Sequence, residues 1–291
     1  MNTSLAYLIG MIVGNGEVQK KRNETIITID IPHKNLIDDE GRETSVYVKS
    51  SLADIRTIIE PLIGSYMPIT TGKGSTKISF TKPNSDPSVL EINRLICNGV
   101  RQQTLKMNKE IHKMTKDENK EFLRGIADVT GYIRRSNIAY GQPGHHRVYI
   151  EIPGNWKTLI DIANILKSLD IPIQTIDFGH PNFRDPHLIK YKEGKFYYWK
   201  KEHQLKVWAN EFVPIGFNIV HKQKALEKLS NELLGVMSNT QTHKFYWQKN
   251  RKRRARKPKH PMEKDSSLPR KIKGKHYDSW QVLAKDLGYH E

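Results

Sequence analysis

The sequence predicts an α+β fold made of two similar halves, each combining helices with an antiparallel sheet, and three observations support this prediction. A glycine-rich apolar segment at residues 5–18 resembles a second one at residues 122–133. Both are followed by a basic stretch and then by a strand that ends in isoleucine, an acidic residue, isoleucine and proline. Apolar and polar residues alternate along both strands, which is typical of a sheet with one buried face. The repetition favours two subdomains related by a pseudo-twofold axis.

The glycines of the two segments keep the same spacing. Gly10 aligns with Gly125 and Gly16 aligns with Gly131, both at a shift of 115 residues. Helix backbones approach closely only where small residues meet. We therefore expect the two helices to touch through Gly10, Gly14, Gly125 and Ala127. Gly16 and Gly131 follow the helices, and we expect them to adopt the left-handed conformation that often ends a helix.

The order of elements is also shared by the two halves. Helices follow from apolar residues that recur every three or four positions, and strands from apolar–polar alternation bounded by turn residues. In the first half these patterns predict a helix at 3–14, strands at 24–32 and 45–49, a helix at 52–63, a strand at 76–82 and a helix at 87–97. In the second half they predict a helix at 120–129, a strand at 147–153, a helix at 156–169, strands at 173–178, 195–198 and 204–208, and a helix at 221–234.

Charge and composition narrow the function. Lys and Arg total 48 and Asp and Glu total 31, which leaves a formal net charge of +17. Such an excess favours a polyanionic partner, because each neutralised phosphate releases condensed counterions. The longest apolar run, residues 5–13, is too short to span a bilayer and lacks the features of a signal peptide, so we expect no membrane association. The single cysteine, Cys97, excludes a disulfide framework and fits a reducing, cytoplasmic compartment.

Residues 8–16 and 123–131 resemble degenerate LAGLIDADG motifs. With the basic hairpins and strands that follow them, they make residues 3–236 similar to the LAGLIDADG homing-endonuclease family of the two-motif, single-chain type. The resemblance implies two αββαββα repeats, at residues 1–115 and 116–236, whose antiparallel sheets form a saddle over duplex DNA. It also implies a monomer with internal pseudo-twofold symmetry, located with the nucleoid, or in the nucleus or an organelle of a eukaryotic host. The implied activity is Mg²⁺-dependent cleavage of DNA.

The sequence departs from the family where the metal is bound. In the family, the residue before the last glycine of each motif is the acid that binds the divalent cation, and here these positions hold Asn15 and Thr130. Asparagine is a weak ligand for a hard cation and threonine a poor one. Asp30 and Glu151 lie at equivalent positions near the ends of the returning strands, and we expect them beside Asn15 and Thr130 as replacement metal ligands. The alternative is that they bind a neighbouring Lys or Arg, or orient water. Asp128 is expected at the helix interface.

The polar strand faces and the hairpins are the predicted DNA-binding surface. A polar strand face is often simply solvated, but the net charge and the basic hairpins favour DNA. Antiparallel strands can enter the major groove and read base edges. The candidate contacts are Lys20, Lys21, Arg22, Thr28, Lys49, Lys77, Arg134, Arg135, Arg147, Tyr149 and Lys206.

The last part of the chain, residues 237–291, is predicted to be a basic extension. Residues 244–275 carry 14 Lys or Arg against Glu263 and Asp265. Three interpretations stay open: a solvated linker, an arm that binds phosphates, and a nuclear-targeting signal of the same composition. As an arm, the extension would contact DNA through Arg251, Arg253 and Arg254.

Two functions follow from these observations. The first is a sequence-specific, Mg²⁺-dependent DNA endonuclease of homing or restriction type with a displaced metal site. The second is a DNA-binding regulator or targeting subunit that has the fold without cleavage. Asn15 and Thr130 favour the second, whereas the acidic pair Asp30 and Glu151 keeps the first open.

Overall fold

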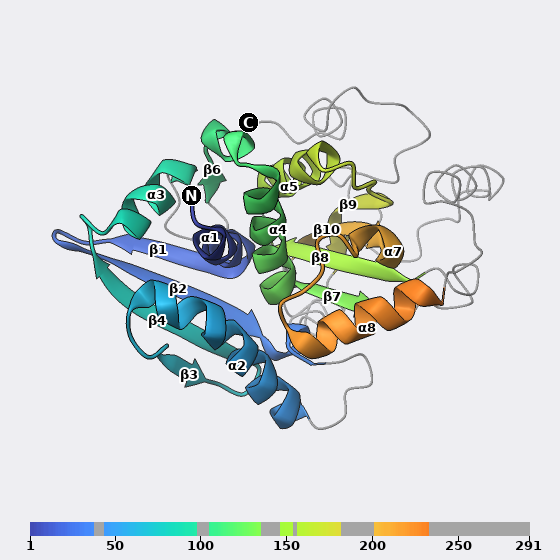
Figure 1. The fold of residues 1–291 in the computed structure, drawn as a ribbon, viewed down its shortest axis with the longest axis horizontal. Coiled ribbons are helices and arrows are strands. Elements are labelled where there is room, and N and C mark those ends of the chain that lie inside the picture. The colour runs from blue at the N-terminus through green and yellow to red at the C-terminus, as the bar shows by residue number, and fades with distance from the viewer. Residues whose placement is uncertain (38–43, 98–104, 135–145, 154–155, 182–200, 233–291) are drawn as a thin grey trace, which may run out of the picture.

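The computed structural model describes residues 1–37, 44–97, 105–134, 146–153, 156–181 and 201–232. Within them the chain folds into two units, shown in Figure 1, that share one order of elements: helix, two strands, helix, two strands, helix. The first unit consists of α1 (Thr3–Asn15), β1 (Gly16–Lys20), β2 (Glu24–Pro32), α2 (Thr44–Ile63), β3 (Ile69–Thr71), β4 (Ser75–Pro83) and α3 (Pro87–Leu95). The second consists of α4 (Lys116–Thr130), β7 (Gly131–Arg134), β8 (Arg147–Pro153), α5 (Trp156–Ser168), β9 (Thr175–Pro181), β10 (Lys201–Trp208), α7 (Ala209–Phe212) and α8 (Val220–Asn231).

Short elements complete the described part of the chain. A 3₁₀ turn, η1 (His33–Asn35), follows β2. Between the two units, β5 (Ile96–Cys97) pairs with β6 (Lys106–Met107), and a second 3₁₀ turn, η2 (Lys109–Lys113), leads into α4. A capping box starts α4, because the Thr115 side chain accepts from the backbone of Glu118 while the Glu118 side chain accepts from the backbone of Thr115.

The two four-stranded sheets have the same topology. Their strand orders are β1-β2-β4-β3 and β7-β8-β10-β9, and every neighbouring pair of strands is antiparallel. The register matches as well: Gly16 pairs with Ile29, and Gly131 pairs with Ile150. The structure therefore confirms the predicted α+β fold with two pseudo-symmetric repeats.

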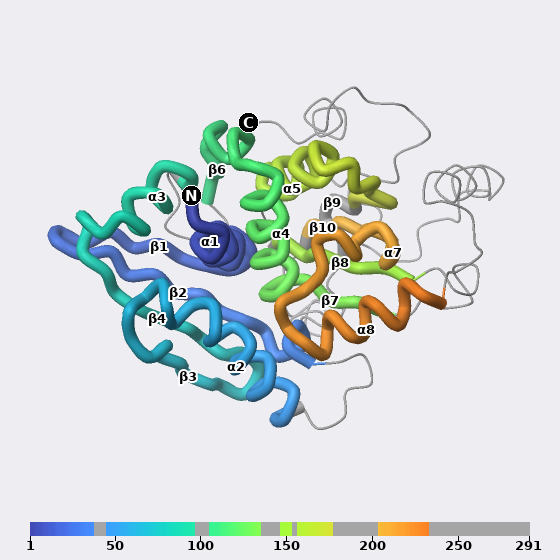
Figure 2. The backbone as a smooth tube through the Cα atoms, viewed as in Figure 1, coloured from blue at the N-terminus to red at the C-terminus, as the bar shows by residue number. Residues whose placement is uncertain are grey.

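The two units meet through α1 and α4, which lie side by side between the two sheets in Figures 1 and 2. A Cβ added to Gly10 would collide with the backbone carbonyl of Phe122. A Cβ added to Gly125 would collide in the same way with the carbonyl of Tyr7. Tyr7 and Phe122 are themselves related by the 115-residue shift of the repeat, so the contact is reciprocal. The predicted close approach of the two glycine-bearing helices is confirmed.

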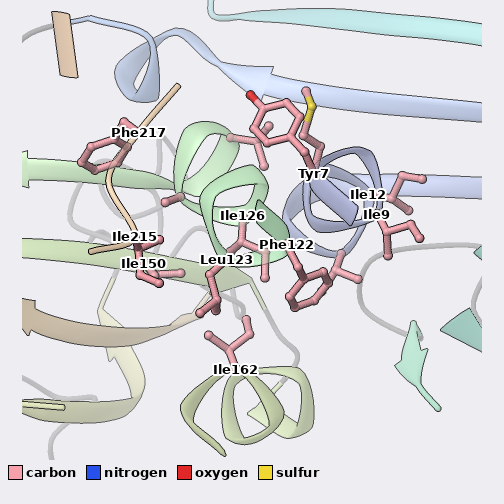
Figure 3. Packing of buried hydrophobic residues seen from close by; sticks show 14 of the residues in the cluster. Tyr7, Ile9, Ile12, Phe122, Leu123, Ile126, Ile150, Ile162, Ile215 and Phe217 are labelled. Atoms are coloured by element: carbon pink, nitrogen blue, oxygen red, sulfur yellow. The ribbon is translucent and has the colours of Figure 1, made fainter. Parts of the chain in front are cut away.

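Apolar side chains on the inner faces of the sheets pack against these helices. Along β2, Ile27, Ile29 and Ile31 are fully buried, and they alternate with partly exposed residues. The second unit repeats the pattern, because Val148, Ile150 and Ile152 of β8 are fully buried. Figure 3 shows Leu123 of α4 directed toward Ile162 of α5 within this core. The outer, polar face of each sheet is thereby left as the candidate surface.

The predicted strand at residues 45–49 is wrong, because this segment forms the first turns of α2. Its alternation of valine with polar residues resembles a strand, but Val48 is buried on the same side of the helix as Leu52, Ile55 and Ile59. Packing of this stripe outweighs the local β-propensity. The edge of the first sheet is instead the unpredicted strand β3.

The expectation for the glycines that follow the motif helices is also wrong. Gly16 has φ −114° and Gly131 has φ −91°, so neither is left-handed. Each helix runs directly into a strand, without a turn. Glycine is required there for space: an added Cβ would lie 2.6 Å from the Cα of Ile12 at Gly16 and 2.6 Å from the carbonyl oxygen of Ala127 at Gly131.

Other element boundaries differ only at their ends. The helix predicted at 87–97 stops at Leu95, and its last two residues form β5. The strand predicted at 195–198 and the extension from residue 237 onward lie outside the described residues. None of the helices in the described ranges has both the length and the apolar character needed to cross a membrane.

Candidate functional site

The C-terminal ends of α1 and α4 hold two of the predicted site residues. Asn15 is the last residue of α1, and its Nδ2 donates a hydrogen bond to the backbone oxygen of Asp30. Thr130 is the last residue of α4 and is buried, and its hydroxyl donates to the backbone oxygen of Ile126 at 2.8 Å. The structure thus brings Asn15 and Asp30 together, whereas the Thr130 hydroxyl is bound to its own helix.

Glu151 is surrounded by hydrogen-bond donors. Its Oε2 lies 2.8 Å from Nζ of Lys34, which belongs to the other half of the chain. Its Oε1 accepts from the Tyr132 hydroxyl at 2.8 Å and from Nε2 of Gln204 at 2.9 Å. Burial and the adjacent Glu151 carboxylate raise the pKa of Tyr132 far above its usual value, so the phenol stays protonated and donates. Both oxygens of Glu151 are therefore engaged by the protein.

Asp30 has a different environment at the equivalent position. It pairs across the sheet with Lys77, as Glu151 pairs with Gln204. One oxygen of Asp30, Oδ1, is buried and has no hydrogen-bond partner among the described residues. Where the second half has Tyr132 beside Glu151, the first half has Glu17, which cannot donate a hydrogen bond when ionised. The two carboxylates are equivalent in position but not in bonding.

These residues do not fit a divalent-metal site that uses both carboxylates. Mg²⁺ binds oxygen ligands whose lone pairs are free to face the ion. Glu151 already faces the ammonium group of Lys34, and the Thr130 hydroxyl is hydrogen-bonded to the backbone of its own helix. In the described ranges no three His, Cys, Asp or Glu side chains come together to hold a metal ion. Of the two carboxylates Asp30 and Glu151, only Asp30 has a buried oxygen without a hydrogen-bond partner in the described part of the chain.

The outer face of the second sheet carries a row of aromatic rings and cations. Tyr132 of β7 and Tyr149 of β8 stack with their centroids 5.1 Å apart and an interplanar angle of 7°. Arg134 lies over the Tyr132 ring at 5.5 Å, and Lys206 of β10 lies over the Tyr149 ring at 5.7 Å. Cation–π attraction and stacking hold this row in place. The row thus crosses the three adjacent strands β7, β8 and β10, with its cations on β7 and β10.

The outer face of the first sheet carries hydroxyl groups beside the charged residues Glu17, Asp30 and Lys77. Thr28 of β2 and Ser79 of β4 face each other, with their hydroxyl oxygens 3.1 Å apart. They occupy the positions that Tyr149 and Lys206 occupy in the second sheet. Lys77, Ser79 and Thr81 are exposed along β4. This sheet therefore offers hydroxyl groups where the other offers rings and cations.

The remaining predicted contacts are scattered. Lys20, Lys21 and Arg22 are exposed at the β1–β2 hairpin. Lys49 is exposed on α2, not on a strand. Arg147 is only 9% exposed, and its guanidinium lies over the Trp208 ring at 4.8 Å. The other four, Arg135, Arg251, Arg253 and Arg254, lie outside the described residues.

The geometry now identifies the architecture. Two αββαββα units with identical sheet topology meet through the helices that carry the glycine motifs, and both helices end at the first strand of their sheet. This is the LAGLIDADG fold. The fold places the outer faces of the sheets and the ends of α1 and α4 as its candidate functional surfaces.

Comparison with known proteins gives distant similarities. No protein-family model matches the chain, and no curated protein matches it. Among solved structures, variants of the homing endonuclease I-DmoI are 16% identical over 76% of this chain and 95% of theirs, with a TM-score of 0.39. I-DmoI in complex with DNA and calcium is 18% identical over 74% of this chain and 90% of its own, with a TM-score of 0.39. Full-length WhiA from Thermatoga maritima is 14% identical over 86% of this chain and 66% of its own, with a TM-score of 0.43.

Two residues of η1 connect the halves of the LAGLIDADG fold, and the sequence offered no signal for either. Lys34 reaches Glu151, and the neighbouring Asn35, 3% exposed, donates from Nδ2 to the backbone oxygen of Val129 at 2.8 Å. Both contacts join η1 of the first half to elements of the second half. Contacts between residues so far apart in sequence become visible only in the folded chain.

A third unpredicted residue, Lys222 of α8, caps the end of α4. Its Nζ donates to the backbone oxygens of Ala127 at 2.9 Å and Gly131 at 2.8 Å. The Ala127 carbonyl also accepts the backbone N–H of Gly131, so the lysine adds a second, charged donor at the last turn of α4. Burial lowers the pKa of Lys222 to about 8. A lysine on the apolar side of the helix predicted at 221–234 was the available signal.

Asp128 lies at the helix interface. It is fully buried, and its Oδ2 accepts from the Tyr7 hydroxyl of α1 at 2.9 Å and from the backbone N–H of Asn218 at 3.0 Å. Burial raises the pKa of Asp128, and the nearby charge of Lys222 opposes that rise. The pair of Tyr7 and Asp128 thus joins the two units by a hydrogen bond in the core.

Proposed function

We propose that this chain binds double-stranded DNA through the outer faces of its two sheets. The observation that carries the proposal is the row of Arg134, Tyr132, Tyr149 and Lys206 on the second sheet, in a chain with a net charge of +17. Phosphates attract such cations, and antiparallel strands can enter the major groove. The hydroxyl-bearing face of the first sheet adds groups suited to base edges.

The two halves are proposed to contact different parts of the duplex, the first the base edges and the second the phosphates. Hydroxyl groups such as those of Thr28 and Ser79 both donate and accept, so they can read either kind of base edge. Cations such as Lys206 position the protein on the phosphates without reading sequence. A single chain with unlike halves is expected to cover an asymmetric DNA site.

The bonding of Glu151 favours binding without cleavage, as in a regulator or a targeting subunit. A divalent ion beside this carboxylate would have to displace or face the ammonium of Lys34. A second candidate function is a Mg²⁺-dependent endonuclease of homing or restriction type. The observation in its favour is the buried Oδ1 of Asp30, which has no hydrogen-bond partner among the described residues and belongs to a carboxylate near the end of α1.

The binding proposal is tested by selecting duplexes from a random library and measuring Kd at several salt concentrations. Lys206→Ala is expected to weaken binding to selected and unrelated duplexes alike and to lower the salt slope by roughly one. Lys224→Ala removes an exposed lysine of α8 and is the matched control. No binding to any duplex at low salt, or equal effects of the two variants, would refute the proposal.

Sequence reading is tested separately at the first sheet. Ser79→Ala is expected to relax base preference at one position of the selected site by roughly 1–3 kcal/mol, with the salt slope unchanged. Cleavage is then assayed on the selected duplex with Mg²⁺ or Mn²⁺. Intact DNA supports the binding-only function. Cutting by the unmodified chain that disappears in Asp30→Asn, with binding retained, supports the endonuclease.

A further inference from the structure

The ends of the two motif helices concentrate negative charge. Unsatisfied carbonyl groups give a helix C-terminus a partial negative charge. α1 and α4 both end where the carboxylates of Asp30 and Glu151 stand near the first strands of the sheets. Nearby positive charge is needed to stabilise this concentration of negative charge, and a bound divalent metal ion is one possible source of it.

The protein supplies two amines at this point. Lys222 binds the carbonyl groups at the end of α4 from inside the core. Lys34 lies 2.8 Å from Glu151, and the side chains of the two residues are 28% and 11% exposed respectively. Limited exposure reduces screening by solvent, so this ion pair is stronger than a pair at the open surface.

We propose that Lys34 supplies the positive charge at the centre formed by Asp30 and Glu151 at the ends of α1 and α4. Its ammonium group occupies the side of Glu151 that a divalent metal ion would need. The charges at the ends of α1 and α4 are then balanced by the folded chain itself, without a metal ion. This inference does not depend on DNA being the ligand, because it concerns contacts within the folded chain.

Three contacts keep the Lys34 ammonium in this place. The neighbouring Asn35 ties η1 to the end of α4 through the carbonyl of Val129. The other oxygen of Glu151 accepts from Tyr132 and Gln204, which orients the carboxylate toward Lys34. Val129, Tyr132 and Gln204 all belong to the second half, whereas Lys34 comes from the first. The ammonium is therefore built into the junction between the halves.

The first half cannot replace this arrangement with a metal site of its own. At the positions of Tyr132 and Gln204 it has Glu17 and Lys77, so Asp30 lacks the donor set that holds Glu151. Glu17 and Asp30 are two carboxylates, and among the described residues no third His, Cys, Asp or Glu side chain joins them, which is too little for a tightly held divalent ion. Removal of the Lys34 charge is expected to make Glu151 available and to create metal affinity that the natural chain lacks.

The experiment measures Mn²⁺ binding to the full chain without DNA, by thermal unfolding and by electron paramagnetic resonance of the free ion. A ligand that binds the folded state raises the unfolding temperature. The natural chain is expected to show no shift with Mn²⁺. Lys34→Met is expected to bind Mn²⁺ at least about tenfold more tightly, because repulsion by the ammonium is gone. The gain should disappear in Lys34→Met combined with Glu151→Gln.

The control is Lys20→Met, which removes an exposed hairpin lysine and the same unit of charge. A gain of Mn²⁺ affinity in this control equal to that of Lys34→Met would overturn the proposal. So would a natural chain that binds Mn²⁺ as tightly as Lys34→Met, or a folded Lys34→Met with no response to Mn²⁺. Where Lys34→Met does not fold, Lys34→Gln keeps a hydrogen-bond donor without the charge. A Mn²⁺ shift in the natural chain that Glu151→Gln abolishes also overturns the proposal. All these outcomes are independent of DNA binding.

Discussion

Replacing Gly10 by alanine should push the helices α1 and α4 apart and so weaken the contact between the two halves of the fold. The added Cβ would lie only 2.9 Å from the carbonyl carbon of Phe122 and still closer to its oxygen, whereas ordinary contact begins at 3.4 Å. The obstacle is backbone in the middle of a helix, which cannot rotate away as a side chain can. The carbonyl oxygen is the nearest obstacle, so the α1–α4 distance must grow by roughly 1 Å.

The cost follows from the size of the contact that opens. A radial gap of about 0.5–1 Å forfeits roughly a quarter to a half of the dispersion energy of each atom pair that it separates. Overpacking of a core costs about 1–3 kcal/mol or more. Alanine regains about 1 kcal/mol through its better helix propensity. Because the obstacle is rigid backbone, the cost lies at or above the upper end of the overpacking range, and we expect Gly10→Ala to lower the free energy of unfolding by about 2 kcal/mol or more.

Urea unfolding followed by circular dichroism measures this loss. Gly74→Ala is the control, because an added Cβ there has nothing within 4 Å. Gly14→Ala should cost less than Gly10→Ala, since its new methyl group meets the side chains of Val129 and Thr130. Gly10→Ala combined with Gly125→Ala should be less than additive, because one separation relieves both collisions. A midpoint for Gly10→Ala equal to that of Gly74→Ala would refute the reasoning.

Two further predictions concern buried polar groups. Tyr7→Phe removes the hydroxyl that donates to the buried carboxylate of Asp128 at 2.9 Å, and should lower the free energy of unfolding by about 1.5–3 kcal/mol in urea titrations; an unchanged midpoint would contradict the inferred role of this hydrogen bond. Burial raises the pKa of Asp161 to about 6 from 3.8, so the ionised form is disfavoured in the folded protein. The resulting destabilisation is absent below pH ~4, grows up to pH ~6 and is constant above, so Asp161→Asn should stabilise the protein by about 2 kcal/mol at pH 8 but not at pH ~4. Equal urea midpoint shifts at both pH values would contradict this assignment.

Local patterns were enough to locate the pieces of the LAGLIDADG fold. The strands β2 and β8 were predicted with the bounds that they have in the structure. Alternation of isoleucine with polar residues, ending in proline, is compatible with few structures other than a strand. The shift that relates Gly10 to Gly125 predicted the helix contact, because backbones can meet only at such residues. The pattern around Val48 is compatible with both a strand and a helix. The local sequence favoured a strand, but the segment forms a helix because α2 packs against the core.

The candidate site was less visible in the sequence. Register placed Asp30 and Glu151 at equivalent positions, as the repeat had indicated. Their different bonding depends on Lys34, a residue 117 positions from Glu151, and no local pattern encodes such a pair. Thr130 is found at its predicted position, but its hydroxyl turns back to its own helix.

The sequence by itself determined which residues repeat, which strand faces are buried and which helices must touch, since these depend on periodicity and on the size of side chains. Only the tertiary structure decided which charged side chains pair at the ends of α1 and α4, where a lysine from one half meets a carboxylate from the other. The physical reason is the separation along the chain over which each feature can be detected. Periodicity involves residues that are close in sequence, whereas an ion pair between distant residues depends on a distance that only folding creates.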